Sequence, residues 1–87
     1  MNKIKSYVGF AIKSRKIIYG ADNIMSSKTC KLILASENLS QNTLNKLKSK
    51  NVNIQILPAS EFELLDLNGL VVAITDESLA NAIKNNI

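Results

Sequence analysis

The sequence contains no histidine and no tryptophan, and it has only one cysteine, Cys30, and one proline, Pro58. Without histidine there can be no serine-histidine triad, no histidine-ligated zinc or haem, and no imidazole base that titrates near neutral pH. A single cysteine excludes a disulfide framework and a four-cysteine metal site, and we expect Cys30 to be a small core or edge residue. The sequence therefore predicts a protein that is not an enzyme and that needs no cofactor and no metal.

Long apolar runs are also missing. The longest runs, residues 69–74 and 32–35, fall far short of the roughly 20 residues that a membrane-spanning helix needs. The positively charged start, residues 1–6, is not followed by an apolar stretch of signal-peptide length. We therefore expect a cytoplasmic, monomeric protein with no membrane partner. At 87 residues the chain is long enough for one packed domain, spanning 1–87.

The charge is distributed unevenly along the chain, whose net charge is +4. Residues 1–50 carry ten basic residues against two acids, whereas residues 51–87 carry one lysine against five acids. Such asymmetry is typical of a protein that meets a polyanion on one face, although an ordinary solvated surface is the alternative reading.

The apolar periodicity predicts helices that alternate with strands. Apolar residues at helical spacing in 3–16 predict a first helix with one buried stripe, formed by Ile4, Tyr7, Val8, Ala11 and Ile12. A strand is expected over 16–19, Gly20 ends it, and a second helix follows from Ala21 to about Ser27. The run 31–35 predicts a buried strand.

The second half of the chain continues this alternation. Ser40 is a good N-cap for a third helix that buries Leu44 and Leu47 and exposes Lys46, Lys48 and Lys50. A strand over 52–57 alternates apolar and polar residues, which predicts one exposed face. The spacing of Ser60 and Glu63 indicates a capping box for a short fourth helix. Residues 70–74 predict the strongest strand, and Thr75 or Asp76 caps a last helix. This order predicts a three-layer α/β/α sandwich around a small mixed sheet of about four strands.

The segment from Arg15 to Asn23 is the strongest candidate for a binding site. A basic strand there enters a glycine turn and then a helix N-terminus, which offers free backbone N–H groups to an anion. Gly20 allows a phosphate or sugar to come close, and Asp22 and Asn23 carry groups able to contact base edges. The alternative is an ordinary strand-to-helix turn. The acids elsewhere in the chain are best explained as surface residues and helix-start residues.

Three stretches of the chain together resemble a known family. They are Arg15 to Gly20, then Lys31 to Glu37 with Asn42 and Thr43 downstream, and then Val71 to Asp76. In order and spacing they look like the small bacterial YlxQ-type members of the ribosomal L-seven-Ae/L-thirty-e family, over about residues 4–83. The resemblance implies an α/β/α sandwich fold and a non-enzymatic RNA-binding function. Many members of that family recognise kink-turns, which are sharply bent internal loops built on sheared G·A pairs.

The resemblance also implies which residues contact RNA. The strand-to-helix turn that meets the G·A pairs corresponds to Lys16, Gly20, Asp22 and Asn23, with Ser26 one helical turn further on, where archaeal members carry a lysine. The loop at Glu37 and the apolar loop at Leu70 and Val71 would flank a flipped-out nucleotide. The expected partner is a kink-turn-like RNA, either ribosomal RNA or a messenger leader, and the ribosome itself is a second expected partner.

Two functions stay open at this point. The first is an RNA-binding module whose affinity falls as salt rises. The alternative is a protein-binding or ribosome-assembly module on the same scaffold, with weak or no kink-turn affinity and the acidic C-terminal half as its contact surface.

Overall fold

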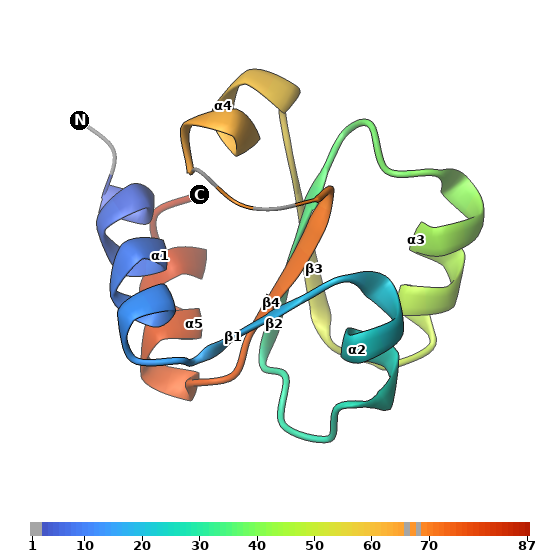
Figure 1. Ribbon diagram of the computed structural model, residues 1–87, viewed down its shortest axis with the longest axis horizontal. Coiled ribbons are helices and arrows are strands. Elements are labelled where there is room, and N and C mark those ends of the chain that lie inside the picture. Colours follow the sequence, from blue (N-terminus) through green and yellow to red (C-terminus); the bar gives the residue numbers. More distant parts are fainter. Residues whose placement is uncertain (1–2, 66, 68) are drawn as a thin grey trace.

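The computed structural model describes residues 3–65, 67 and 69–87, which form five helices and four strands (Figure 1). The helices are α1 Lys3–Lys13, α2 Ala21–Ser26, α3 Gln41–Lys48, α4 Ala59–Leu64 and α5 Glu77–Lys84. The strands are β1 Ile17–Tyr19, β2 Leu32–Ser36, β3 Asn53–Leu57 and β4 Val71–Ile74. Each element lies within a few residues of its predicted position.

The four strands form one mixed sheet in the order β1-β4-β2-β3. β4 is antiparallel to both of its neighbours, β1 and β2, whereas β2 and β3 are parallel. The carboxyl ends of β1, β2 and β3 therefore meet the amino end of β4 at one end of the sheet. The opposite end collects the starts of β1, β2 and β3 and the last residues of β4.

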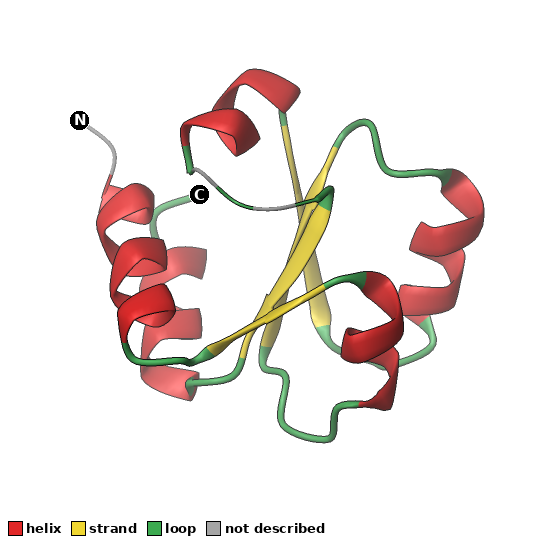
Figure 2. Cartoon of the chain, in the orientation of Figure 1, coloured by secondary structure: helices red, strands yellow, loops and turns green. Residues whose placement is uncertain are grey.

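Helices cover both faces of this sheet, which confirms the predicted α/β/α sandwich (Figure 2). On one face α1, α4 and α5 pack against alternate strand residues such as Leu32, Leu34 and Val72. On the other face α2 and α3 contribute Ile24 and Leu47 to a second cluster of buried side chains. Because β2 faces a helix layer on each side, all five of its residues are buried, as its unbroken apolar run predicts. Cys30 lies in the second cluster, as expected of a small core residue.

Two of the expected helix caps are present and one is wrong. The Ser40 hydroxyl accepts a hydrogen bond from the Thr43 N–H, and the Asp76 carboxylate accepts one from Ser78 N–H at 2.9 Å. The capping box at Ser60 does not form, because α4 begins at Ala59 after Pro58. The Ala59 N–H instead donates to the Glu37 carboxylate at 2.7 Å. A residue 22 positions away in sequence therefore replaces the local cap.

Three further expectations need correction. Ile12, expected in the buried stripe of α1, is 37% exposed, because the face of α1 that packs on the sheet buries only Ile4, Val8 and Ala11. Lys50 is half-buried instead of exposed, because its ammonium group donates hydrogen bonds to the carbonyls of Met25 and Ser27, where α2 ends. Ile56 is 50% exposed, although the alternation in its strand groups it with Val52 and Ile54. β3 is an edge strand, and only Val52 and Ile54 of these three pack against the cluster around Leu47. Among the described residues, no helix is long and apolar enough to cross a membrane.

Candidate nucleic-acid interface

Three segments that the sequence marks as candidate RNA contacts meet at one end of the sheet. The Gly20 N–H donates to the Val71 carbonyl at 3.3 Å, and the Ser36 N–H donates to the Leu70 carbonyl at 2.8 Å. These two hydrogen bonds place the turn after β1 and the loop after β2 on either side of the segment that enters β4. We name the surface made by Gly20, Asp22, Asn23, residues 36–38 and Leu70 the junction end of the sheet.

Glycine is required at position 20 because of the backbone conformation there, and not because a side chain would lack space. It has φ +88° and ψ 142°, a combination that is almost confined to glycine. A Cβ added there would have only one neighbour within 4 Å, the Asn23 side-chain nitrogen at 3.9 Å. The turn is therefore open to solvent above Gly20, and its shape depends on a glycine.

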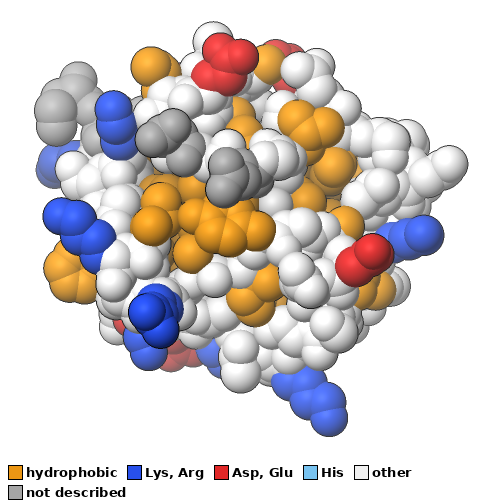
Figure 3. All heavy atoms as spheres, viewed as in Figure 1, with side chains coloured by type: hydrophobic (Ala, Val, Ile, Leu, Met, Phe, Trp, Pro, Cys, Tyr) orange, Lys and Arg blue, Asp and Glu red, His pale blue; other side chains and the backbone are white. Residues whose placement is uncertain are grey.

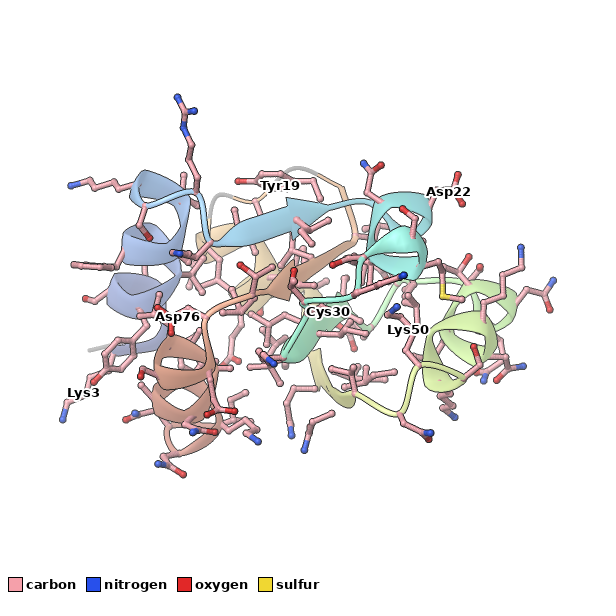
Figure 4. The ribbon with its side chains drawn as sticks, turned by 90° about the horizontal axis from the view of Figure 1, so that it is seen from below. Lys3, Tyr19, Asp22, Cys30, Lys50 and Asp76 are labelled. Carbon is pink, nitrogen blue, oxygen red and sulfur yellow. The ribbon has the colours of Figure 1, made fainter. Side chains whose placement is uncertain are left out.

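In the first turn of α2, the Asn23 side chain is fixed by a hydrogen bond, whereas the Asp22 side chain extends into solvent. Asn23 is exposed, and its side-chain amide nitrogen donates to the Tyr19 carbonyl at 3.0 Å, so the side-chain oxygen is the group that can accept a further hydrogen bond. Asp22 is exposed, and its side chain points away from the body of the molecule (Figure 4). Ser26, one turn later, donates its hydroxyl to the carbonyls of Asp22 and Asn23, both at 3.2 Å.

Glu37, which was predicted to contact RNA, also makes hydrogen bonds within the protein. Its Oε2 accepts the hydrogen bond from Ala59 N–H, and its own N–H donates to the Leu57 carbonyl at 2.9 Å. A carboxylate at the start of a helix is stabilised by the N–H groups there. Glu37 therefore fixes α4 beside the junction end.

The two apolar residues predicted to flank a nucleotide differ in exposure. Leu70 is 45% exposed, whereas Val71 is only 4% exposed and packs in the α2 and α3 cluster. The side chain that this loop offers to a nucleotide is therefore that of Leu70, because β4 directs the Val71 side chain into the core. Ile56, which pairs with Ala35 near this end of the sheet, is also exposed, and the sequence did not predict this. Its only signal was its position two residues before Pro58, near the end of an edge strand.

Lys16 lies away from the other predicted contacts. It precedes β1, and about 13 Å of extended chain separates it from Gly20. Its carbonyl accepts the Thr75 N–H at 2.9 Å, at the opposite end of β4. Lys31 joins the same end, because its N–H donates to the Ile74 carbonyl at 2.7 Å.

Half of the ten basic residues in positions 1–50 lie at this opposite end. Lys13 ends α1, Arg15 and Lys16 lead into β1, and Lys28 and Lys31 lie in the loop that enters β2 (Figure 1). We name these five residues the basic end of the sheet. Figure 3 shows Lys and Arg side chains along the margin formed by α1 and below it. The uneven charge of the sequence is thus also uneven in space, but it is not concentrated at the junction end.

No family model matches this chain, and neither does any curated protein. A solved structure from Bacillus halodurans, described as a protein of unknown function, is similar to it, with a TM-score of 0.81 and 15% sequence identity. The similarity covers 98% of this chain and 96% of that one. The likeness establishes that the fold occurs as a whole in another protein.

Proposed function

We propose that this protein is a cytoplasmic, non-enzymatic RNA-binding module that recognises a bent RNA internal loop with sheared G·A pairs at the junction end of the sheet. The observation that carries the proposal is the pair of hydrogen bonds that join the Gly20 turn and the loop after β2 to the strand segment between them. These segments are far apart in sequence, and the resemblance to the kink-turn-binding family assigns an RNA contact to each of them. Their meeting on one exposed surface is what such a contact requires.

The groups at this surface suit recognition by shape. Gly20 leaves backbone accessible, the Asn23 oxygen and the Asp22 carboxylate accept hydrogen bonds, and Leu70 offers an apolar contact. Acceptor groups pair with exocyclic amines on base edges, and unstacked bases rest on apolar side chains. The carboxylates of Asp22 and Glu37 repel phosphates, so specificity at this end must come from base edges and RNA shape.

The test compares two RNAs at two salt concentrations. One contains the sheared G·A pairs, and the other replaces them with Watson–Crick pairs. We expect tighter binding to the first RNA, and a loss of roughly tenfold or more in affinity between 50 and 200 mM salt if several phosphates are contacted. Equal affinity for the two RNAs would refute the proposal and leave the assembly module as the better explanation.

Leu70→Ala and Asp22→Asn locate the binding surface. Leu70→Ala should weaken binding to the bent RNA, whereas Asp22→Asn should strengthen it, because the amide removes a negative charge and adds a donor. Glu63→Gln is the matched control for Asp22→Asn, since it removes the same charge from an exposed site on α4. If Glu63→Gln strengthens binding as much as Asp22→Asn, the surface has been assigned wrongly.

A further inference from the structure

We propose a second RNA-contacting surface, formed by Phe10, Lys13, Arg15 and Lys16, that holds an unpaired stretch of RNA by stacking a base on Phe10 and pairing phosphates with the three cations. The proposal rests on the proposed function in taking RNA as the partner. It concerns a different surface, because these residues lie at the C-terminal end of α1 and the start of β1.

Phe10 is the first observation. It is 64% exposed, more than any other large apolar side chain that the structure describes. It lies outside the buried stripe of α1, whose buried residues are Ile4, Val8 and Ala11. An exposed aromatic ring is a stacking platform that accepts any base, because every base has a flat π-face.

The cations beside Phe10 are the second observation. Lys13 is three residues further along α1, so its side chain shares a helix face with that of Phe10. Arg15 and Lys16 follow directly in the turn that ends α1, so both lie within six residues of Phe10 along the chain. None of Lys13, Arg15 and Lys16 has a side-chain hydrogen bond or ion pair in the part of the chain that the structure describes. Their charges are therefore available to a ligand.

The backbone at Arg15 is the third observation. Arg15 has φ +59°, in the left-handed region that favours glycine. The turn is a full Schellman motif, in which Lys16 N–H donates to the Ala11 carbonyl at 2.8 Å and Arg15 N–H donates to the Ile12 carbonyl at 3.2 Å. Glycine is the usual residue at this position, and the protein places an arginine there instead. A residue held in an unfavourable conformation on the surface points to a role for its side chain.

The composition of the surface favours unpaired RNA over other partners. The first acid of the chain is Asp22, so neither α1 nor β1 contains a carboxylate to oppose a polyanion. Two acids, Asp76 and Glu77, lie at the same end of the sheet, at the start of α5. The Asp76 carboxylate accepts a hydrogen bond from the Ser78 N–H and caps the helix. An aromatic ring next to free cations matches alternating bases and phosphates, and a duplex would keep its bases stacked and inaccessible to Phe10.

The experiment measures binding of a fluorescent uridine oligomer of about eight nucleotides, a length within the usual single-strand site size. Phe10→Ala and Arg15→Gly should each reduce affinity about tenfold, and Arg15→Gly should also lower the slope of log affinity against log salt by about 0.7. Lys46→Glu is the control, because it changes the net charge by more than Arg15→Gly does, on the exposed face of α3. It should change affinity by less than about twofold.

The outcomes separate this proposal from the proposed function. If the oligomer binds and the Phe10 and Arg15 variants do not weaken it, or if Lys46→Glu weakens it equally, the second surface is refuted. The proposal would also be refuted if the protein bound a poly-glutamate peptide or anionic lipid vesicles more tightly than the oligomer, and if the Phe10 and Arg15 variants weakened that binding. If the oligomer binds through Phe10 and Arg15 while the bent and Watson–Crick RNAs bind equally, this proposal stands and the proposed function fails.

Discussion

The two ends of the sheet carry different kinds of residue. The junction end has a glycine turn, two carboxylates and the exposed apolar side chain of Leu70. The basic end has five cations, and its two acids, Asp76 and Glu77, begin a helix where negative charge is favourable. The fold therefore separates the groups to which we assign recognition of RNA shape from the cations to which we assign attraction of a polyanion. Substitutions should be able to change specificity and affinity independently, and each prediction below tests that separation.

The largest effect is expected from Ile74→Ala, which should weaken both ends together. Ile74 is fully buried in β4, with Ile17 of β1 on one side and Leu32 of β2 on the other. Its truncation leaves a cavity and should cost about 2–5 kcal/mol in the free energy of unfolding. Urea denaturation measures the loss. Amide exchange should show Gly20 and Lys31 losing protection equally, since each donates to a carbonyl of β4.

Ile87→Ala is the matched control, because the same truncation at an exposed residue should change stability by less than about 0.5 kcal/mol. Loss of protection at only one of the two amides in Ile74→Ala would show that the two ends unfold separately.

Gly20→Val should affect the junction end alone. Valine cannot easily adopt φ +88°, so the turn must either strain or rearrange, at a cost of about 1–3 kcal/mol. Discrimination between bent and Watson–Crick RNA should be lost, whereas binding of the uridine oligomer should persist. Gly9→Ala is the control, because Gly9 lies within α1 with no atom within 4 Å of an added Cβ. It should stabilise the protein by about 0.5–1 kcal/mol and leave both RNA activities intact.

Lys50→Met should loosen the junction end indirectly. The Lys50 ammonium holds the carbonyls of Met25 and Ser27, which ties the end of α2 to the turn after α3 (Figure 4). Its loss should cost about 1 kcal/mol, measured by urea denaturation. Lys48→Met, at an exposed position two residues earlier, should have little effect. Equal losses in the two variants would mean that the Lys50 contacts add nothing to stability.

The order of the elements was predictable from the sequence, because periodicity and caps are local signals. Ser40 and Asp76 act as caps through hydrogen bonds that span two or three residues. The errors involve contacts between distant segments. Glu37 caps α4 from 22 residues away, and Lys50 reaches α2 across more than 20 residues. No local pattern encodes such a pairing.

The candidate site shows the same division. Gly20 and Asn23 are recognisable from the local sequence as a turn and a helix start. That Leu70 belongs to the same surface was predicted only from the family resemblance. Lys16 and Gly20 already stand at opposite ends of the predicted strand. What the sequence does not reveal is the antiparallel pairing of β1 with β4, which places Val71 beside Gly20 and Thr75 beside Lys16. Phe10 was identifiable only as an aromatic residue outside the apolar stripe of its helix.

The smallest effect is expected from Arg15→Gly, and it has opposite signs for stability and binding. Glycine adopts the left-handed conformation at this position without strain, so the free energy of unfolding should rise by about 0.5–1 kcal/mol. Asn51→Gly is the matched control, because Asn51 also has a left-handed conformation, with φ +58°, and asparagine tolerates it better than arginine does. Its gain should therefore be smaller. A stability gain in Arg15→Gly, together with weaker binding of the uridine oligomer and unchanged discrimination of the bent RNA, would establish that the basic end has its own role. Unchanged stability would mean that the turn places no strain on Arg15, and the backbone would then give no reason to assign its side chain a function.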